Sequence, residues 1–63
     1  MSDFKSRLTV ENDELVEKIA KLEDFLASEK SKEIDEDQLM LLGIQLNAMR
    51  TYLTCLTARI DRL

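Results

Sequence analysis

The most constraining feature of this sequence is an unbroken heptad pattern of apolar residues through its second half. Apolar side chains recur at alternating intervals of three and four residues, at Leu39, Leu42, Leu46, Met49, Leu53, Leu56, Ile60 and Leu63. This spacing places them on one side of an α-helix, and more than three heptads of it are typical of a helix packed lengthwise against another helix. The pattern predicts a helix over about residues 36–62, which would be about 40 Å long.

A second heptad pattern precedes this one and contains a single polar member. It runs through Leu8, Asn12, Leu15, Ile19, Leu22 and Leu26. We predict a first helix over about residues 9–28, with Ser2 or Thr9 as its N-cap. Asn12 is interpreted as a polar seam residue that specifies register or oligomeric state.

Residues 28–34 break the apolar periodicity and predict a solvated connector between the two helices. Asp35 is predicted to cap the second helix, with Gln38 completing a capping-box-like pair and Ile34 packing against Leu39. Because the connector is short, the two helices are expected to form an antiparallel hairpin. The predicted fold class is therefore all-α, with residues 1–63 as one helical-hairpin domain.

The chain is small, and the usual ways of stabilising so small a unit are restricted. It has 63 residues with one cysteine and no histidine, which excludes an intramolecular disulfide and a Cys/His zinc site. Units of this size usually need a disulfide, a metal or a partner chain. Self-association is the remaining route, so we expect a homo-oligomer.

The second helix carries unusually few charges, which agrees with that expectation. Residues 1–37 have a net charge of −6 and residues 38–63 a net charge of +2, which together give the −4 of the whole chain. The apolar surface of the second helix also extends beyond the heptad positions, to Met40, Leu41, Ile44, Ala48 and Cys55. One partner helix cannot cover so wide an apolar surface. We therefore predict a helical bundle in which this helix packs against the first helix on one side and another subunit on the other.

Composition also excludes several classes of function. A net charge of −4 argues against non-specific binding to DNA or RNA, which requires a basic surface. No apolar run is long enough to span a membrane, and the single thiol fits a reducing cytoplasm. With no histidine and no candidate activator for Cys55, the chain is not expected to be an enzyme, and no cofactor is expected.

The candidate binding residues lie beside the heptad seam of the second helix. Gln45, Tyr52 and Arg59 recur every seven residues and supply an amide, an aromatic ring and a guanidinium group. These groups are suited to contact a base edge, stack on a base and hold a phosphate. The alternative interpretation is structural: Tyr52 fills an interface and Arg59 pairs with an acidic residue of the first helix.

Two segments carry patterns that are more specific than the heptads. Residues 14–26 match E-L-x-E-K-I-x-K-L-x-x-F-L, and residues 41–60 match L-L-x-x-Q-L-x-A-M-x-x-Y-L-x-x-L-x-x-R-I. Over residues 8–62 the chain resembles a family of small tailed-phage proteins, crAss-like and related. The chain has Thr51, Thr54 and Thr57 where that family often has Glu or Lys.

That family is similar in size and layout to the helical-hairpin sponges with which phages counter CBASS and Thoeris immunity. The resemblance implies a phage anti-defence protein of the host cytoplasm that binds a cyclic nucleotide or cyclic ADP-ribose-type signal between subunits without cleaving it. Tyr52, Arg59 and Gln45 would then contact the ligand, together with Lys21 of the first helix, and Arg50 would lie at the rim. Two alternatives remain: a module that inhibits a host protein through its apolar helix face, and a structural coiled-coil adaptor.

Overall fold

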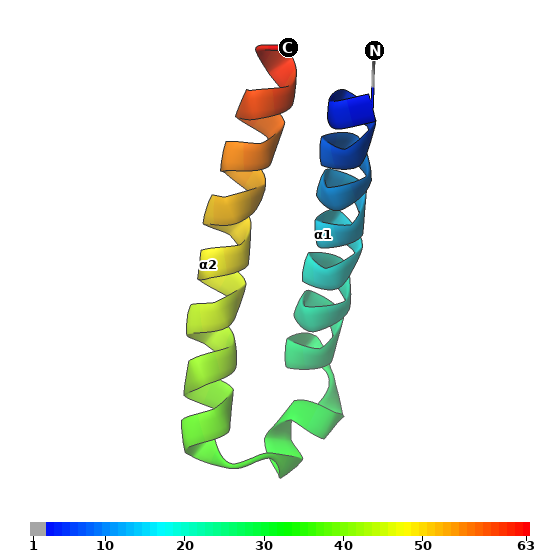
Figure 1. Ribbon diagram of the computed structural model, residues 1–63. Coiled ribbons are helices and arrows are strands. Elements are labelled where there is room, and N and C mark those ends of the chain that lie inside the picture. The colour runs from blue at the N-terminus through cyan, green and yellow to red at the C-terminus, as the bar shows by residue number, and fades with distance from the viewer. Residues whose placement is uncertain (1–2) are drawn as a thin grey trace.

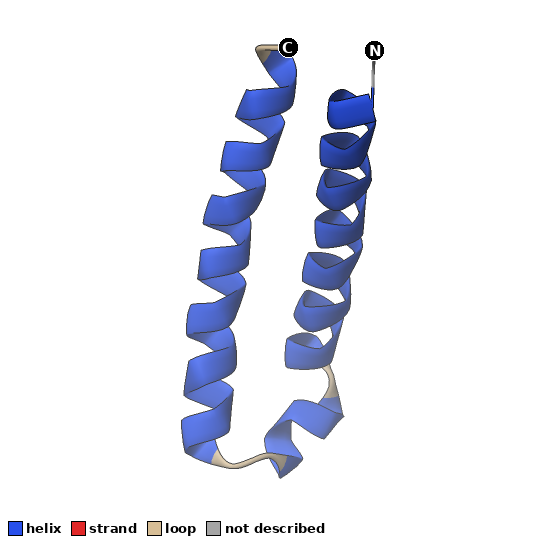
Figure 2. Cartoon of the chain, in the orientation of Figure 1, coloured by secondary structure: helices blue, strands red, loops and turns tan. Residues whose placement is uncertain are grey.

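The chain forms two antiparallel α-helices joined by a short 3₁₀ helix (Figure 1). The computed structural model describes residues 3–63. Helix α1 spans Asp3–Ala27, the 3₁₀ helix η1 spans Glu29–Glu33, and helix α2 spans Glu36–Asp61. In the described part of the chain, Figure 2 shows loop segments at the short connections around η1 and at the C-terminal end. The predicted all-α antiparallel hairpin is confirmed for the described residues.

Helix α1 begins about six residues earlier than the sequence pattern predicted. It starts at Asp3, which is acidic in the first turn and pairs with Arg7 one turn later at 2.7 Å. Thr9 is inside the helix, where its hydroxyl donates a hydrogen bond to the Lys5 carbonyl at 2.9 Å. The predictions of a start near residue 9 and of Thr9 as the N-cap are therefore wrong, because residues 3–8 contain nothing that breaks a helix. Ser2, the other predicted cap, lies outside the described residues.

Helix α2 begins where the sequence predicted. The Asp35 side chain accepts a hydrogen bond from the Asp37 backbone N–H at 3.0 Å and so acts as the N-cap. Glu36 and Asp37 place negative charge in the first turn, near the positive end of the helix dipole. The helix ends at Asp61, one residue before the predicted end.

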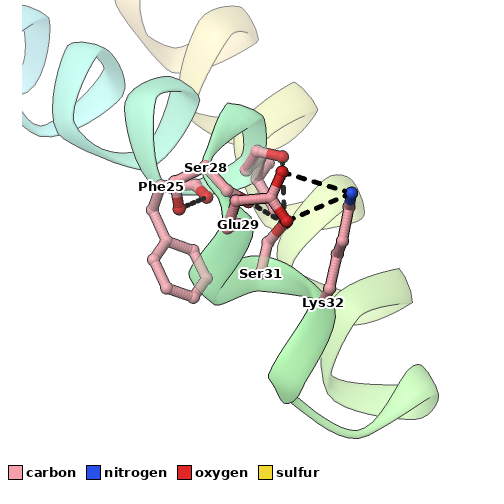
Figure 3. A network of polar contacts seen from close by, with 6 residues as sticks. Phe25, Ser28, Glu29, Ser31 and Lys32 are labelled. Atoms are coloured by element: carbon pink, nitrogen blue, oxygen red, sulfur yellow. Dashed lines mark hydrogen bonds and ion pairs between the residues drawn. The ribbon is translucent and has the colours of Figure 1, made fainter.

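The connector is more ordered than its composition predicted. The Ser28 hydroxyl donates to the Phe25 carbonyl at 2.7 Å, and the Ser31 hydroxyl is within reach of the carbonyls of Ser28 at 2.8 Å and Leu26 at 3.2 Å (Figure 3). Ser31 is buried. The Leu26 carbonyl belongs to the last turn of α1, where carbonyl groups lack partners within the helix. The Phe25 and Ser28 carbonyls also accept the backbone N–H groups of Ser28 and Ser31. The two serines therefore close α1 and fold the connector into η1.

The core is a single line of side chains between the two helices. The buried members are Leu8, Leu15, Ile19, Leu46 and Leu56. The half-buried residues packed against them are Leu22, Leu26, Met49, Leu53 and Ile60. All ten belong to the two predicted heptad patterns, and among residues 3–63 Leu56 is the one side chain with no exposed surface.

The molecule is elongated, and much of its surface stays open. It measures 48 × 15 × 13 Å and exposes 5029 Å², whereas a compact protein of the same mass would expose about 4,200 Å². The first and last residues of the second heptad pattern, Leu39 and Leu63, lie at opposite ends of that pattern and are 37% and 58% exposed. Each helix thus buries one face against the other, and the side of α2 that points away from α1 stays uncovered.

Gly43 provides a test of whether α2 is open to solvent at this residue, as it is in the single hairpin. A methyl group added at its Cα would meet nothing within 4 Å apart from its chain neighbours and the backbone of its own helical turns. We therefore expect Gly43→Ala to raise the free energy of unfolding by about 0.5–1 kcal/mol, because the unfolded chain loses conformational freedom and α2 gains helix propensity. Urea unfolding followed by circular dichroism measures this change.

Ala20→Gly, on the exposed side of α1, is the reciprocal control and should lower the stability by a similar amount. A loss of stability in Gly43→Ala would show that another helix approaches α2 at this residue.

Candidate functional site

Two polar contacts between the helices fix how their side faces are arranged. Arg50 of α2 donates to the Glu23 carboxylate at 2.6 Å, and the Thr57 hydroxyl donates to the Asn12 side-chain oxygen at 3.0 Å. Arg50 and Thr57 are seven residues apart and therefore lie on the same side of the α2 seam. This contact between the helices agrees with the predicted role of Asn12 in specifying the register of the hairpin.

The predicted ligand residues of α2 lie on the other side of the seam. We call this surface the Tyr52 flank. On α2 it comprises Gln45, Tyr52 and Arg59. Since like flanks face each other in an antiparallel helix pair, α1 contributes Glu11, Lys18 and Phe25, which recur at the same interval of seven.

The three α2 residues of the Tyr52 flank are exposed, and Tyr52 retains 46% of its surface. Successive members are about 10.5 Å apart along the helix, so the row is about 21 Å long. Within residues 3–63, no ion pair or side-chain hydrogen bond engages Gln45, Tyr52 or Arg59. The expected alternative, an Arg59 ion pair with an acidic residue of α1, does not form there.

Arg50 lies away from this row. Its ion pair with Glu23 places it on the opposite side of the seam, with its side chain 51% exposed. The structure therefore separates Arg50 from Tyr52 on a single hairpin. A ligand at the Tyr52 flank would not meet Arg50 of the same chain.

Lys21 lies on the same side of α1 as the Tyr52 flank but is turned further from α2. Lys18 comes one position closer to the seam, because it is seven residues from Phe25 and Glu11. Lys18 was not among the predicted ligand residues, although this heptad spacing identifies it as the cation on the inner edge of α1. Glu11 is the acidic member of the flank and would oppose an anion bound nearby.

Two open hollows of the described surface, of about 390 Å³ each, lie away from the Tyr52 flank. One is lined by Lys5, Ser6, Thr9 and Val10, and the other by Leu53, Thr54, Thr57, Ala58 and Asp61. Neither contains a predicted ligand residue. The Tyr52 flank is thus an open surface that another molecule would have to cover.

Among residues 3–63, no three Cys, Asp or Glu side chains come together as a metal site would require. Neither α1 nor α2 has an apolar stretch sufficient to cross a membrane.

The fold and the Tyr52 flank together define a class: a small helical hairpin that presents an amide, an aromatic ring and a guanidinium on an open helix face. The model of the Sequestin family matches residues 2–62, and the chain belongs to that family. The name of the family indicates sequestration of a molecule and does not say which one. No curated protein and no solved structure matches the chain.

The Arg50–Glu23 ion pair yields a quantitative prediction. Because both side chains are about half exposed, a double-mutant cycle with Arg50→Ala and Glu23→Ala should give a coupling energy of about 0.2–1 kcal/mol. The coupling should shrink as salt is added, since exposed charges are screened. Zero coupling at low salt would show that the pair does not hold the helices in register.

Proposed function

We propose that this protein is a phage anti-defence protein that sequesters a cyclic nucleotide-type immune signal in the host cytoplasm. Membership of the Sequestin family supports sequestration of a molecule in general. The observation that carries the finer proposal is the Tyr52 flank, where an amide, an aromatic ring and a guanidinium stand exposed in one row without partners among residues 3–63.

Each member of this row has a specific role in the proposal. The Tyr52 ring stacks on a base, an interaction worth about 1–3 kcal/mol in other proteins. Arg59 holds a phosphate through charge-assisted hydrogen bonds, and Gln45 reads a base edge with its amide. Lys18 and Lys21 add positive charge from α1.

The proposed action is binding without cleavage. The chain has no histidine to act as a general base, and among residues 3–63 its one thiol, Cys55, has no hydrogen-bond partner that could activate it. The residues of the Tyr52 flank offer positive charge, hydrogen bonds and a stacking surface, which bind nucleotides without a nucleophile. We therefore propose that the protein lowers the free concentration of the signal and returns it unchanged on dissociation.

A ligand on the Tyr52 flank requires a second subunit in this proposal. The row is about 21 Å long and open to solvent, so one hairpin contacts a nucleotide from one side only. Ligand sites in proteins usually bury most of the ligand surface. A homo-oligomer that brings two such rows together would supply the missing wall.

A second candidate function rests on a different observation. Met40, Leu41 and Ile44 are 60%, 52% and 59% exposed near the start of α2. A contiguous exposed apolar surface of this kind is typical of a protein-binding site. In this alternative the protein inhibits a host protein through that surface and binds no nucleotide.

Native mass spectrometry separates the two candidates. The purified protein is measured alone and with a panel of cyclic dinucleotides, cyclic trinucleotides and cyclic ADP-ribose isomers. We expect a closed oligomer that gains whole numbers of one ligand. An oligomer that gains no member of the panel would contradict the nucleotide proposal and favour the protein-binding alternative.

Substitutions on the Tyr52 flank test the proposed site. Tyr52→Ala and Arg59→Ala should each weaken binding of the identified nucleotide about 10- to 100-fold, because a stacked ring or a charge-assisted contact is lost. Glu11→Gln should strengthen it, since a negative charge near the phosphate is removed. Isothermal titration calorimetry gives the dissociation constants.

Lys32→Ala is the matched control for Arg59→Ala. It also removes one positive charge, but Lys32 lies in η1 and pairs with Glu29 at 3.3 Å. This variant should bind the nucleotide as the wild type does. Equal losses in Lys32→Ala and Arg59→Ala would mean that total charge, and not a site at Arg59, determines binding.

A further inference from the structure

Helix α2 carries a second heptad pattern on the side that faces away from α1. Its members, at intervals of four and three residues, are Asp37, Leu41, Ile44, Ala48, Thr51, Cys55, Ala58 and Arg62. We call this surface the outer face of α2. It has an acidic residue at one end, a basic residue at the other, and no charge between them over a length of about 37 Å.

The outer face is suited to burial against another helix. Leu41 and Ile44 are more than half exposed in the single hairpin, which leaves large apolar side chains in water. The Thr51 hydroxyl donates to the Asn47 carbonyl at 3.1 Å, so its polar group is already satisfied within the helix. Burying Thr51 therefore leaves no hydrogen-bond donor unpaired.

We propose that the outer face of α2 binds the same face of a second copy of this chain, with the two α2 helices antiparallel. The two-fold axis passes between residues 49 and 50. This register brings together Leu41 and Ala58, Ile44 and Cys55, Ala48 and Thr51, and Asp37 and Arg62, each pair joining the two copies. The contact is isologous, so every pair occurs twice.

Side-chain size favours the antiparallel arrangement. In this register each large side chain, Leu41 or Ile44, lies against a small one, Ala58 or Cys55, so the spacing between the helices stays even along the contact. A parallel arrangement would place Leu41 against Leu41 at one end and Ala58 against Ala58 at the other. The helices would then diverge at the end with the large residues.

Charge favours the same arrangement. Asp37 and Arg62 lie at opposite ends of the outer face, so antiparallel helices bring opposite charges together at both ends. Parallel helices would place Asp37 beside Asp37 and Arg62 beside Arg62, which is repulsive. In the single hairpin the Arg62 guanidinium reaches the Ala58 carbonyl at 3.0 Å and is therefore positioned along the end of this face.

The pairing has a consequence for the Tyr52 flank, and only this consequence depends on the proposed function. Gln45, Tyr52 and Arg59 lie beside the outer face, and in an antiparallel pair the like edges of the two helices meet. Tyr52 of one copy then lies close to Gln45 of the other. The two rows form one continuous surface, which gives a nucleotide contacts from both chains.

Disulfide trapping without nucleotide tests the register. In the proposed pair residue 44 faces Cys55 of the second copy, whereas the two Cys55 residues are offset by about 16 Å along the axis. A disulfide requires Cα atoms within about 7 Å. Under mild oxidation we therefore expect Ile44→Cys to form a covalent dimer and the wild type to stay uncross-linked.

The double variant Ile44→Cys with Cys55→Ser is the matched control and should not form a disulfide dimer. In a parallel pair Cys55 would face Cys55 of the second copy and residue 44 would face residue 44. The wild type and this double variant would then both cross-link. Either of those results, or no dimer in Ile44→Cys, would overturn the proposal. Since residue 44 is exposed in the hairpin, circular dichroism should show that the variants keep their helices.

Charge exchange gives an independent test. Asp37→Arg should raise the dissociation constant of the dimer about tenfold, because two attractive pairs become repulsive. Adding Arg62→Asp to the same chain should restore the wild-type value. Glu36→Arg, on the neighbouring residue outside this face, is the control and should leave the value unchanged. Failure of the double exchange to restore the dimer would contradict the Asp37–Arg62 pairing, whatever the protein binds.

Discussion

The single seam of apolar side chains between α1 and α2 is the interaction on which the rest of the structure depends. Five buried residues and five half-buried ones make up the core of the described chain, and Leu56 alone is fully enclosed. Helices this long gain most of their stability from packing one face against a partner. Because the seam uses one face of each helix, everything else the protein does must take place on the remaining faces.

Those remaining faces differ sharply between the two helices. The acidic and basic residues of α1 keep its outer side in water, whereas the outer face of α2 has no charge between Asp37 and Arg62. The Tyr52 flank lies between the seam and that outer face. A pairing of two outer faces would therefore stabilise the hairpin and complete the binding surface with the same contact, which links the proposed assembly to the proposed function.

The sequence predicted the features that depend on local patterns. The heptads predicted the hairpin and its core residues, and Asp35 predicted the start of α2 to the residue. The start of α1 was predicted wrongly, because a threonine can either cap a helix or lie inside one. Thr9 lies inside, where its hydroxyl donates a hydrogen bond to the Lys5 carbonyl of the preceding turn. The burial of Ser31 could not be predicted, because it depends on how η1 folds back against the end of α1. Arg50 was predicted at the rim of the site, although it follows the seam residue Met49 whereas Tyr52 precedes the seam residue Leu53. This spacing already placed them on opposite sides of the seam, and the contact with Glu23 confirms it.

The central claim is that the protein holds a cyclic nucleotide-type signal and does not alter it. The most direct measurement is to incubate the protein with the nucleotide that binds, remove the protein by filtration, and analyse the filtrate and the heat-denatured protein by chromatography. The proposal predicts that the nucleotide disappears from the filtrate and is recovered intact, in full, from the denatured protein. A filtrate that still holds the nucleotide, or recovery of a cleaved product, would contradict it.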